Sequence, residues 1–268
     1  MPETIADILR NPVKEKLARG EVVASMTVRL VTSIEIASLA KTAGFDTLYI
    51  DVEHSSLSLA TTSQICIAAL AVGIAPFVRV PSIRPEHVGR VLDGGALGVI
   101  FPHVESAEQA RAMAAACRYP PLGHRSVMGS GPALGYRALP LAEVNAAGNA
   151  DTLLIVMLET PAGIACADAI AAVPGVDVLL IGANDLSAEM GIAGELRHAR
   201  LREAFAAAAA ACKAHNKVLG IGGVRGDLDL QTELFRLGGR FVIAGSDVTY
   251  LAAAASADAK ALRSMQIG

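Results

Sequence analysis

The sequence predicts an α/β fold, a closed (β/α)₈ TIM barrel. Short apolar runs rich in Val, Ile and Leu alternate eight times with alanine-rich segments of helical spacing along the 268 residues. Near-continuous apolar strands are typical of a parallel sheet whose faces are covered by helices. Eight such units in about 250 residues is the size of a closed barrel.

The alternative fold is an open, doubly wound sheet, which would carry a G-x-G-x-x-G turn after its first strand. The corresponding stretch reads "RLVTSIEIA" and contains no glycine. Glycines at 220, 222, 223 and 226 approximate that spacing only late in the chain. We therefore favour the barrel.

The elements follow in order along the chain. The expected strands are apolar runs that stop at a turn residue or a charge, at 22–30, 46–52, 75–80, 97–102, 152–159, 177–182, 217–223 and 240–245. The expected helices are the segments of helical spacing between and after them, at 33–43, 58–72, 85–92, 105–116, 161–173, 196–214, 227–237 and 247–263.

One connection is longer than the others. Residues 117–151 join the fourth helix to the fifth strand and are rich in proline and glycine. Long irregular connections in compact domains are usually functional loops or lids, and a contact between subunits is the alternative. The alternation resumes in phase afterwards, so we expect a single domain over 1–268.

Composition excludes several functional classes. Hydrophobic residues make up 53% and charged residues 18%, and the formal net charge is −3. This balance does not indicate nucleic-acid or membrane partners. The four cysteines are scattered without a C-x-x-C pair, which favours space-filling thiols in a reducing compartment. No signal-peptide core or membrane-length apolar run occurs, so we expect a soluble, cytoplasmic protein.

Charged and polar residues, together with glycines, recur where the expected strands end. In chain order they are Asp51, Glu53 and His54, then Arg79, His103, Glu159, Asp185, Gly222, Gly223 and Arg225, and finally Gly245, Ser246 and Asp247. Chemistry in such barrels gathers at the carboxyl ends of the strands. A strand-end Asp or Ser is often simply a helix cap, and Asp247 and Ser187 fit that reading. His103 could hydrogen-bond a loop. Capping does not explain His54, Arg79 and Glu159.

The rim residues indicate chemistry beside a carbonyl group. Glu159 and Asp185 are two hard oxygen ligands on neighbouring strands, which suit Mg²⁺ or Mn²⁺ better than zinc. Arg79 offers a forked, permanently charged donor for a carboxylate or a developing enolate oxygen. Histidine is the side chain best suited to proton transfer near neutral pH, so His54 could move a proton. Enolisation, aldol cleavage and decarboxylation all remain open on these residues.

The positions of the lysines argue against a Schiff-base mechanism. A Schiff-base aldolase needs an amine at the rim. None of the six lysines lies at the carboxyl end of an expected strand: Lys14, Lys16, Lys41, Lys213, Lys217 and Lys260. The metal-dependent route is therefore favoured.

Six motifs in order resemble the HpcH/HpaI family of class II 2-oxo acid aldolases, over residues 22–250. They are "GFDTLYIDVEHSSLSL", "FVRVPS", "VLDGGALGVIFPHVESAEQA", "RYPPLGHRSV", "MLETPAGI" and "GVDVLLIGANDLSAEMG". The resemblance implies a barrel of the phosphoenolpyruvate/pyruvate type. It also implies a homo-hexamer, a trimer of dimers, in which the last helix, 247–263, is exchanged between neighbours.

The resemblance also implies roles for single residues. A divalent cation (Mg²⁺, Mn²⁺ or Co²⁺) is implied on Glu159 and Asp185, with pyruvate chelating it and Arg79 on the keto oxygen. His54 paired with Asp93 is implied for proton transfer. The remaining implied positions are Asp51 and Glu53 in water-bridged contact with the metal, the backbone around Ala183, Asn184 and Asp185 for the pyruvate carboxylate, and Arg125 near the site.

The sequence departs from the family pattern in two places. Met157 stands where the aldolases closest to the family name often carry Gln. Gly222 and Gly223 replace a bulkier residue on the side of the aldehyde. We expect metal binding and enolate formation to survive both changes, whereas the identity of the substrate is left open.

We therefore expect a metal-dependent lyase that reversibly cleaves a 4-hydroxy-2-oxo acid to pyruvate and an aldehyde. Oxaloacetate decarboxylation, or cleavage of a CoA thioester as in citrate-lyase β-subunit relatives, is the enzymatic alternative. A catalytically silent, ligand-binding barrel is the alternative outside enzymes.

Overall fold

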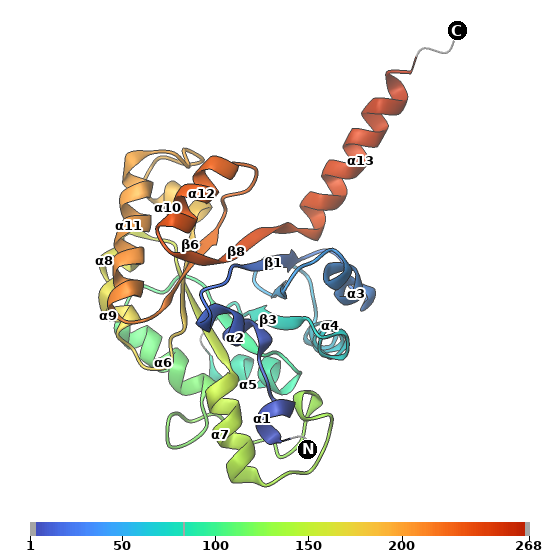
Figure 1. Ribbon diagram of the computed structural model, residues 1–268, viewed down its shortest axis with the longest axis vertical. Helices are drawn as coiled ribbons and strands as arrows, with labels where there is room; N and C mark the ends of the chain where they lie inside the picture. The colour runs from blue at the N-terminus through green and yellow to red at the C-terminus, as the bar shows by residue number, and fades with distance from the viewer. Residues whose placement is uncertain (1–3, 83, 266–268) are drawn as a thin grey trace.

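The structure is a computed structural model that describes residues 4–82 and 84–265. Within these residues, parallel strands close into a barrel in chain order, and β8 pairs with β1 (Figure 1). The predicted (β/α)₈ barrel is confirmed. The strands of the barrel are β1 (Val23–Val28), β2 (Thr47–Asp51), β3 (Ala75–Arg79), β4 (Gly98–Phe101), β5 (Leu153–Leu158), β6 (Val178–Gly182), β7 (Val218–Gly222) and β8 (Gly239–Ser246).

Helices surround this barrel (Figure 1). Those that follow the strands are α3 (Glu35–Thr42), α4 (Leu59–Val72), α5 (Pro85–Asp93), α6 (Ala107–Cys117), α8 (Pro161–Ala165), α9 (Ala167–Ala171), α10 (Ala183–Glu189), α11 (Ala199–Ala214), α12 (Leu228–Arg236) and α13 (Asp247–Arg263). The helical segments elsewhere are α1 (Ile5–Ile8), α2 (Pro12–Ala18), the 3₁₀ turn η1 (Pro132–Leu134) and α7 (Leu141–Asp151).

Several short helices were not expected. The segment 117–151 is only partly irregular, because η1 and α7 lie inside it. At the N-terminus, the side chain of Asn11 caps α2 by accepting from the backbone N–H groups of Val13 and Lys14. Ser246, not Asp247, caps α13. Ser187 lies inside α10 rather than at its cap.

The core has an inner and an outer layer. Large side chains inside the barrel, among them Phe77, Ile155 and Phe241, form one buried cluster. Val13 and Leu17 of α2 belong to the same cluster, so α2 closes the end of the barrel at which the strands begin. The outer layer packs the other faces of the strands against the surrounding helices. The carboxyl ends of the strands open onto a cleft at the barrel mouth.

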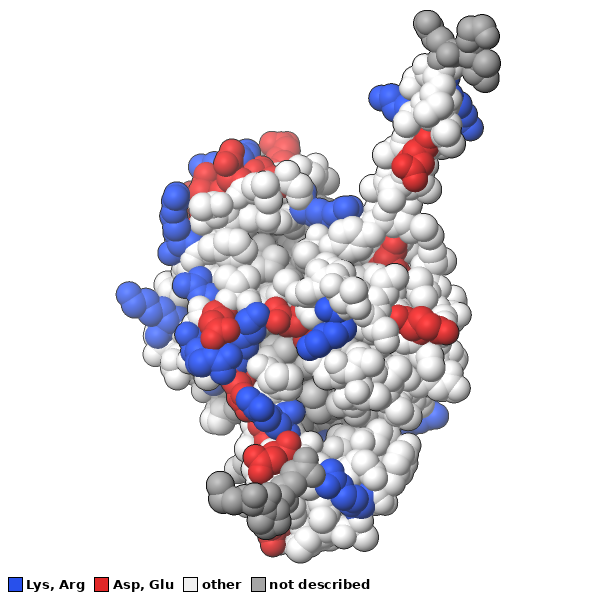
Figure 2. Space-filling model, turned by 45° about the vertical axis from the view of Figure 1, so that its right-hand side comes forward, with Lys and Arg blue, Asp and Glu red and all other residues white. Residues whose placement is uncertain are grey.

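Helix α13 projects away from the barrel (Figure 1). Its side chains beyond Tyr250 are almost all exposed, including Leu251 and Leu262. On the face drawn in Figure 2, acidic and basic side chains are interspersed and do not form a patch of one sign. No helix in the described part of the chain combines the length and apolar composition that a bilayer crossing needs.

Candidate active site

The register of the first three strands places three charged residues side by side at the barrel mouth. Asp51 ends β2 and pairs in register with Arg79, which ends β3. Val28 of β1 pairs with Ile50 of β2, so Arg29, one residue further on, lies beside Asp51. Alternate residues of a strand point to the same side. All three side chains therefore reach the same level of the rim.

Asp51 is the centre of this row. The Arg79 Nε donates to Asp51 Oδ1 at 2.9 Å and its Nη2 to Oδ2 at 2.6 Å. Arg29 Nε also donates to Oδ2, at 2.7 Å. The backbone N–H groups of Glu53 and His54 donate to Oδ1. Burial raises the pKa of Asp51, but Arg79, the His54 N–H and Arg29 outweigh it and hold the pKa below its usual value.

A second chain of contacts runs from Arg79 to Glu159. The third guanidinium nitrogen, Nη1, lies 2.9 Å from Glu53 Oε2. His103 bridges the two glutamates, with Nε2 at 3.2 Å from Glu53 Oε1 and Nδ1 at 3.3 Å from Glu159 Oε2. The backbone N–H of His103 also donates to Glu159 Oε2, at 3.0 Å. This residue has a φ of +54°, an uncommon conformation outside glycine that often marks functional sites.

Glu159 has the features of a cation ligand. Its side chain is 1% exposed, and its Oε1 has no hydrogen-bond partner among the described residues. A side chain at Gly182 would put its Cβ 2.6 Å from that oxygen, so the glycine leaves room for the carboxylate. Burial raises the pKa of Glu159, and the nearby Asp185 carboxylate adds to the rise. A buried carboxylate oxygen without a partner is costly unless a ligand satisfies it.

Asp185 is the other acid on this side of the cleft. It lies in the first turn of α10, is exposed, and makes no side-chain hydrogen bond or ion pair among the described residues. No group of three or more His, Cys, Asp or Glu in the described part of the chain could hold a metal ion by itself. Two carboxylates completed by water and substrate oxygens suit Mg²⁺ or Mn²⁺, which retain several waters. The residues present therefore fit a divalent cation.

Glycines form the adjoining wall of the cleft, where Gly222 of β7 pairs in register with Gly182 of β6. A Cβ on Gly223, whose φ is +79°, would lie 3.1 Å from the backbone nitrogen of Asn184 and 3.3 Å from that of Ala183. This contact brings the loop after β7 against the start of α10. The residues that line the cleft are Thr27, Arg29, Tyr49, His54, Arg79, Met157, Glu159, Gly182, Ala183, Asn184, Asp185, Gly222, Gly223 and Ile243.

His54 lies at the cleft, whereas Asp93 and Arg125 do not. His54 is 54% exposed, and its Nε2 lies 3.9 Å from Glu53 Oε2. Asp93 ends α5, just before β4 begins, so it belongs to the other end of the barrel. There it accepts from Arg125 Nη2 at 2.8 Å, and the Arg125 guanidinium stacks on the Tyr119 ring. One chain therefore does not bring Asp93 or Arg125 to His54.

The sequence did not predict the contacts that Arg29, Tyr49, Met157 and His103 make at the cleft. Arg29 directly follows the first strand, so the argument from strand ends applies to it equally. Tyr49 lies below Arg79, its ring centroid 5.4 Å from the guanidinium carbon, and its hydroxyl donates to Met157 Sδ at 3.4 Å. Burial raises the pKa of Tyr49 well above its usual value. The bridge made by His103 depends on an unusual backbone conformation, which no sequence signal reveals.

Comparison with known proteins identifies related chains. A model of the family HpcH/HpaI aldolase/citrate lyase matches residues 30–254. A 4-hydroxy-4-methyl-2-oxoglutarate aldolase of Hapsidospora irregularis is 44% identical over 260 residues, covering 96% of each chain. One of Chaetomium globosum is 42% identical, covering 91% of this chain and 92% of that one. The solved structure of an HpcH/HpaI aldolase from Desulfitobacterium hafniense DCB-2 superposes with a TM-score of 0.90 at 28% identity, covering 95% and 97%.

Proposed function

The chain belongs to the HpcH/HpaI aldolase/citrate lyase family and is a carbon–carbon lyase of the aldolase type, and from this premise we propose its reaction. It reversibly cleaves a 4-hydroxy-2-oxo acid to pyruvate and a second carbonyl compound, an aldehyde or a 2-oxo acid. The substrate named for the two curated relatives, 4-hydroxy-4-methyl-2-oxoglutarate, would give two molecules of pyruvate by the same cleavage. The silent-barrel alternative is excluded by this family membership.

The unpartnered Oε1 of Glu159 is the observation that carries the proposal. It faces the space left by Gly182, on the side of the cleft that also carries Asp185. Glu159 and Asp185 would hold Mg²⁺, Mn²⁺ or Co²⁺ as the cofactor. A cation there would supply Lewis-acid polarisation of the substrate's 2-oxo group. The backbone at Ala183, Asn184 and Asp185 would hold the pyruvate carboxylate.

Arg79 stabilises the charge that develops on the 2-oxo oxygen. Its guanidinium is 3% exposed and is fixed by Asp51 and Glu53, so it does not need to reorganise as charge appears. Asp51 and Glu53 thereby position Arg79. Met157 Sδ lies 4.0 Å from Arg79 Nη1 and leaves that nitrogen facing a weak acceptor on the cleft side.

His54 carries the proton in this proposal. In cleavage the C4 hydroxyl loses its proton, the C3–C4 bond breaks, and its electron pair passes to the 2-oxo group as the enolate of pyruvate. C4 becomes the carbonyl of the second product, and C3 takes up a proton to become the pyruvate methyl group. His54 is exposed on the cleft and is free to accept the hydroxyl proton.

A homo-oligomer completes the site. If Asp93 assists His54, it must come from a neighbouring copy, because the two residues lie at opposite ends of one barrel. Arg125 forms an ion pair with Asp93, so the same neighbouring copy would place it near the site. The projecting α13 has the exposure expected of a helix exchanged between neighbours. We propose a hexamer built as a trimer of dimers.

The test follows the pyruvate methyl protons in D₂O by NMR, with Mn²⁺ or Mg²⁺ added to chelator-treated protein. We expect cation-dependent loss of the methyl signal, and cleavage of 4-hydroxy-2-oxo acids under the same conditions. Glu159→Gln keeps the shape of the side chain and removes its charge, so it should lose both activities and Mn²⁺ binding by calorimetry. Glu143→Gln, exposed on α7, is the matched control. Cation-independent exchange would disprove the proposal.

A further inference from the structure

Arg29 offers a second, unoccupied guanidinium on the cleft. We propose that it forms a carboxylate subsite for the part of the substrate that leaves as the second carbonyl product. The enzyme would then favour 4-hydroxy-2-oxo acids that carry a carboxylate on C4. This inference rests on the proposed aldol reaction and specifies its substrate class.

The donors left free among Arg29, Asp51 and Arg79 at the barrel mouth carry the argument. Asp51 is one carboxylate between two guanidinium groups, Arg29 and Arg79. All three nitrogens of Arg79 already face Asp51 or Glu53, and its side chain is buried. Arg29 donates to Asp51 through Nε alone, and its Nη1 and Nη2 make no contact with an acceptor among the described residues. Two donor nitrogens of Arg29 therefore remain available at this corner of the cleft.

The position of Arg29 is fixed by the backbone beneath it. The carboxylate of Asp247 accepts from the backbone N–H groups of Arg29, Leu30 and Val31, at distances of 2.8 to 3.2 Å. The Nε contact with Asp51 then sets the orientation of the guanidinium group. A donor held in this way loses little freedom when it binds an anion.

The surroundings of Arg29 leave room for an acid. The guanidinium-bearing side chain is 41% exposed. It lines the same cleft as Glu159 and Asp185, and bare glycines, Gly222 and Gly223, form another part of the wall. A guanidinium group binds a carboxylate through two parallel N–H donors, which Nη1 and Nη2 can supply. Arg79 and Arg29 are the two arginines among the described residues that line this cleft, and no lysine is among them.

The test compares two acceptors of nearly equal size in aldol synthesis with pyruvate: glyoxylate, which carries a carboxylate, and acetaldehyde, which carries a methyl group instead. We expect wild type to have the higher kcat/KM for glyoxylate. Arg29→Gln should lower the glyoxylate-to-acetaldehyde ratio of kcat/KM by about 10- to 100-fold, the usual weight of a charge-assisted hydrogen bond. Arg29→Lys should restore part of the ratio because it keeps the charge.

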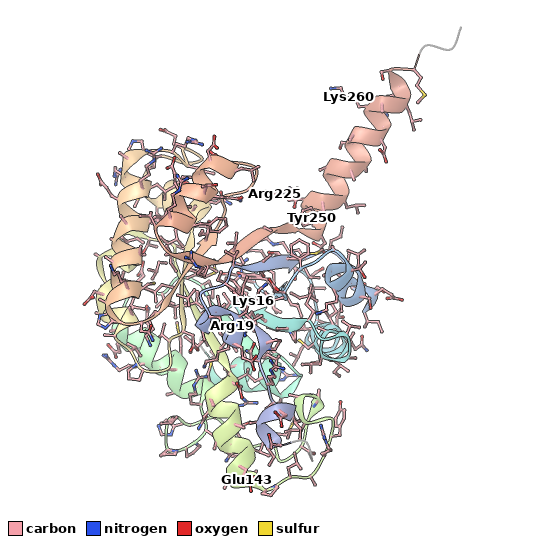
Figure 3. All side chains as sticks on the ribbon, in the orientation of Figure 1. Lys16, Arg19, Glu143, Arg225, Tyr250 and Lys260 are labelled. Atoms are coloured by element: carbon pink, nitrogen blue, oxygen red, sulfur yellow. The ribbon has the colours of Figure 1, made fainter. Side chains whose placement is uncertain are left out.

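Two controls separate this inference from the proposed function. Arg225→Gln removes another exposed arginine, one that stacks on Tyr250 outside the residues lining the cleft, and should leave the ratio as in wild type (Figure 3). Exchange of pyruvate methyl protons is measured in every variant. Equal losses with both acceptors and in exchange would assign Arg29 to the support of Asp51 and overturn the subsite. Absence of exchange in wild type would instead disprove the aldol reaction.

Discussion

At the scale of single residues, the site is defined by charges that are buried and incompletely paired. Removing an ionised group from water is expensive, and the cost is offset only where the partner geometry is good. Arg79 meets this condition through its two hydrogen bonds to Asp51. Glu159 does not, since only one of its two oxygens has partners. The unequal pairing explains why Glu159, rather than Asp51, is the candidate ligand.

Gly182→Ala tests the space in front of Glu159. The backbone at this position, with φ −88°, is open to alanine, but the new Cβ would lie 2.6 Å from Glu159 Oε1. The carboxylate must move, so we expect affinity for Mn²⁺ to fall about 10- to 100-fold, as when support of a metal ligand is lost. Calorimetry measures the affinity. Gly89→Ala, where a Cβ meets nothing within 4 Å, is the control; equal affinities in both variants would contradict the assignment.

His54→Ala separates proton transfer from binding. We expect the variant to bind Mn²⁺ and pyruvate but to lose about 10²- to 10⁴-fold in aldol cleavage, the usual range for a positioned acid–base group. Decarboxylation of oxaloacetate should suffer much less, because loss of CO₂ creates the enolate without removing a proton from the substrate. The measurement is the ratio of the two activities in variant and wild type. Equal losses would show that His54 serves binding or folding.

The location of these residues at the barrel mouth could be predicted, because each lies at or just beyond the carboxyl end of a strand that is recognisable in the sequence. Glu159, Asp185 and Arg79 all lie at the cleft, as expected from the strand ends. Their partners could not be predicted in the same way, because contacts across the rim depend on strand register and on the backbone of the loops. Arg29 is the clearest omission, since the same reasoning applies to the first strand as to the others.

At the scale of elements, the charged residues that follow or end β1 to β3 should make the stability of the fold depend on pH in a predictable direction. These residues are Arg29, Asp51 and Arg79. The pKa of Asp51 is lower in the folded protein than its ordinary value, about 4. A lowered carboxyl pKa contributes stability above the ordinary value, and this contribution is lost as the pH falls through the folded-state value. Acid should therefore weaken the attachment of β1 and β3 to β2 at the barrel mouth.

Asp51→Asn measures that contribution. The variant should be less stable than wild type at pH 6, by about 3 to 5 kcal/mol, because buried Arg79 loses the charge of the carboxylate that accepts two of its hydrogen bonds. The difference in unfolding free energy should shrink as the pH falls below about 4. Urea unfolding at pH 3 to 7 tests both parts. Lowering of stability by a constant amount at every pH would show that the charge of Asp51 is not responsible.

The strands were predicted more accurately than the helices, for a physical reason. Strands buried on both faces must be apolar throughout, and each of the eight expected runs overlaps one strand of the barrel. Short helices bury little surface and leave a weak periodic signal. Thus α2 was missed although Asn11 and Pro12 form a good helix start, and α7 was missed within a segment read as irregular from its proline and glycine content.

At the scale of the whole molecule, helix α13 is the part that one chain leaves without support. Its first turn is attached, because Asp247 holds the loop after β1 and the Tyr250 ring packs beside Phe45. Beyond Tyr250 the helix is almost wholly exposed, with Leu251 at 59% and Leu262 at 66%. Apolar side chains on a projecting helix usually mark an interface. Most helical stability in proteins comes from packing rather than from propensity. The exposure of α13 therefore supports the proposed packing against a neighbouring copy.

A chain ending after Tyr250 tests this dependence while keeping the contacts of Asp247 and Tyr250. We expect its mass by sedimentation to fall below that of the full chain, because the exchanged helix no longer joins the copies. Aldol cleavage should fall with the mass, since Asp93 would no longer reach a neighbour's His54. Binding of Mn²⁺ should persist, since Glu159 and Asp185 belong to the same chain. A chain ending after Arg263 keeps α13 and is the control. Unchanged mass in the shorter chain would rule out α13 as the joining element, and full activity in a dissociated chain would rule out the contribution of Asp93 from a neighbour.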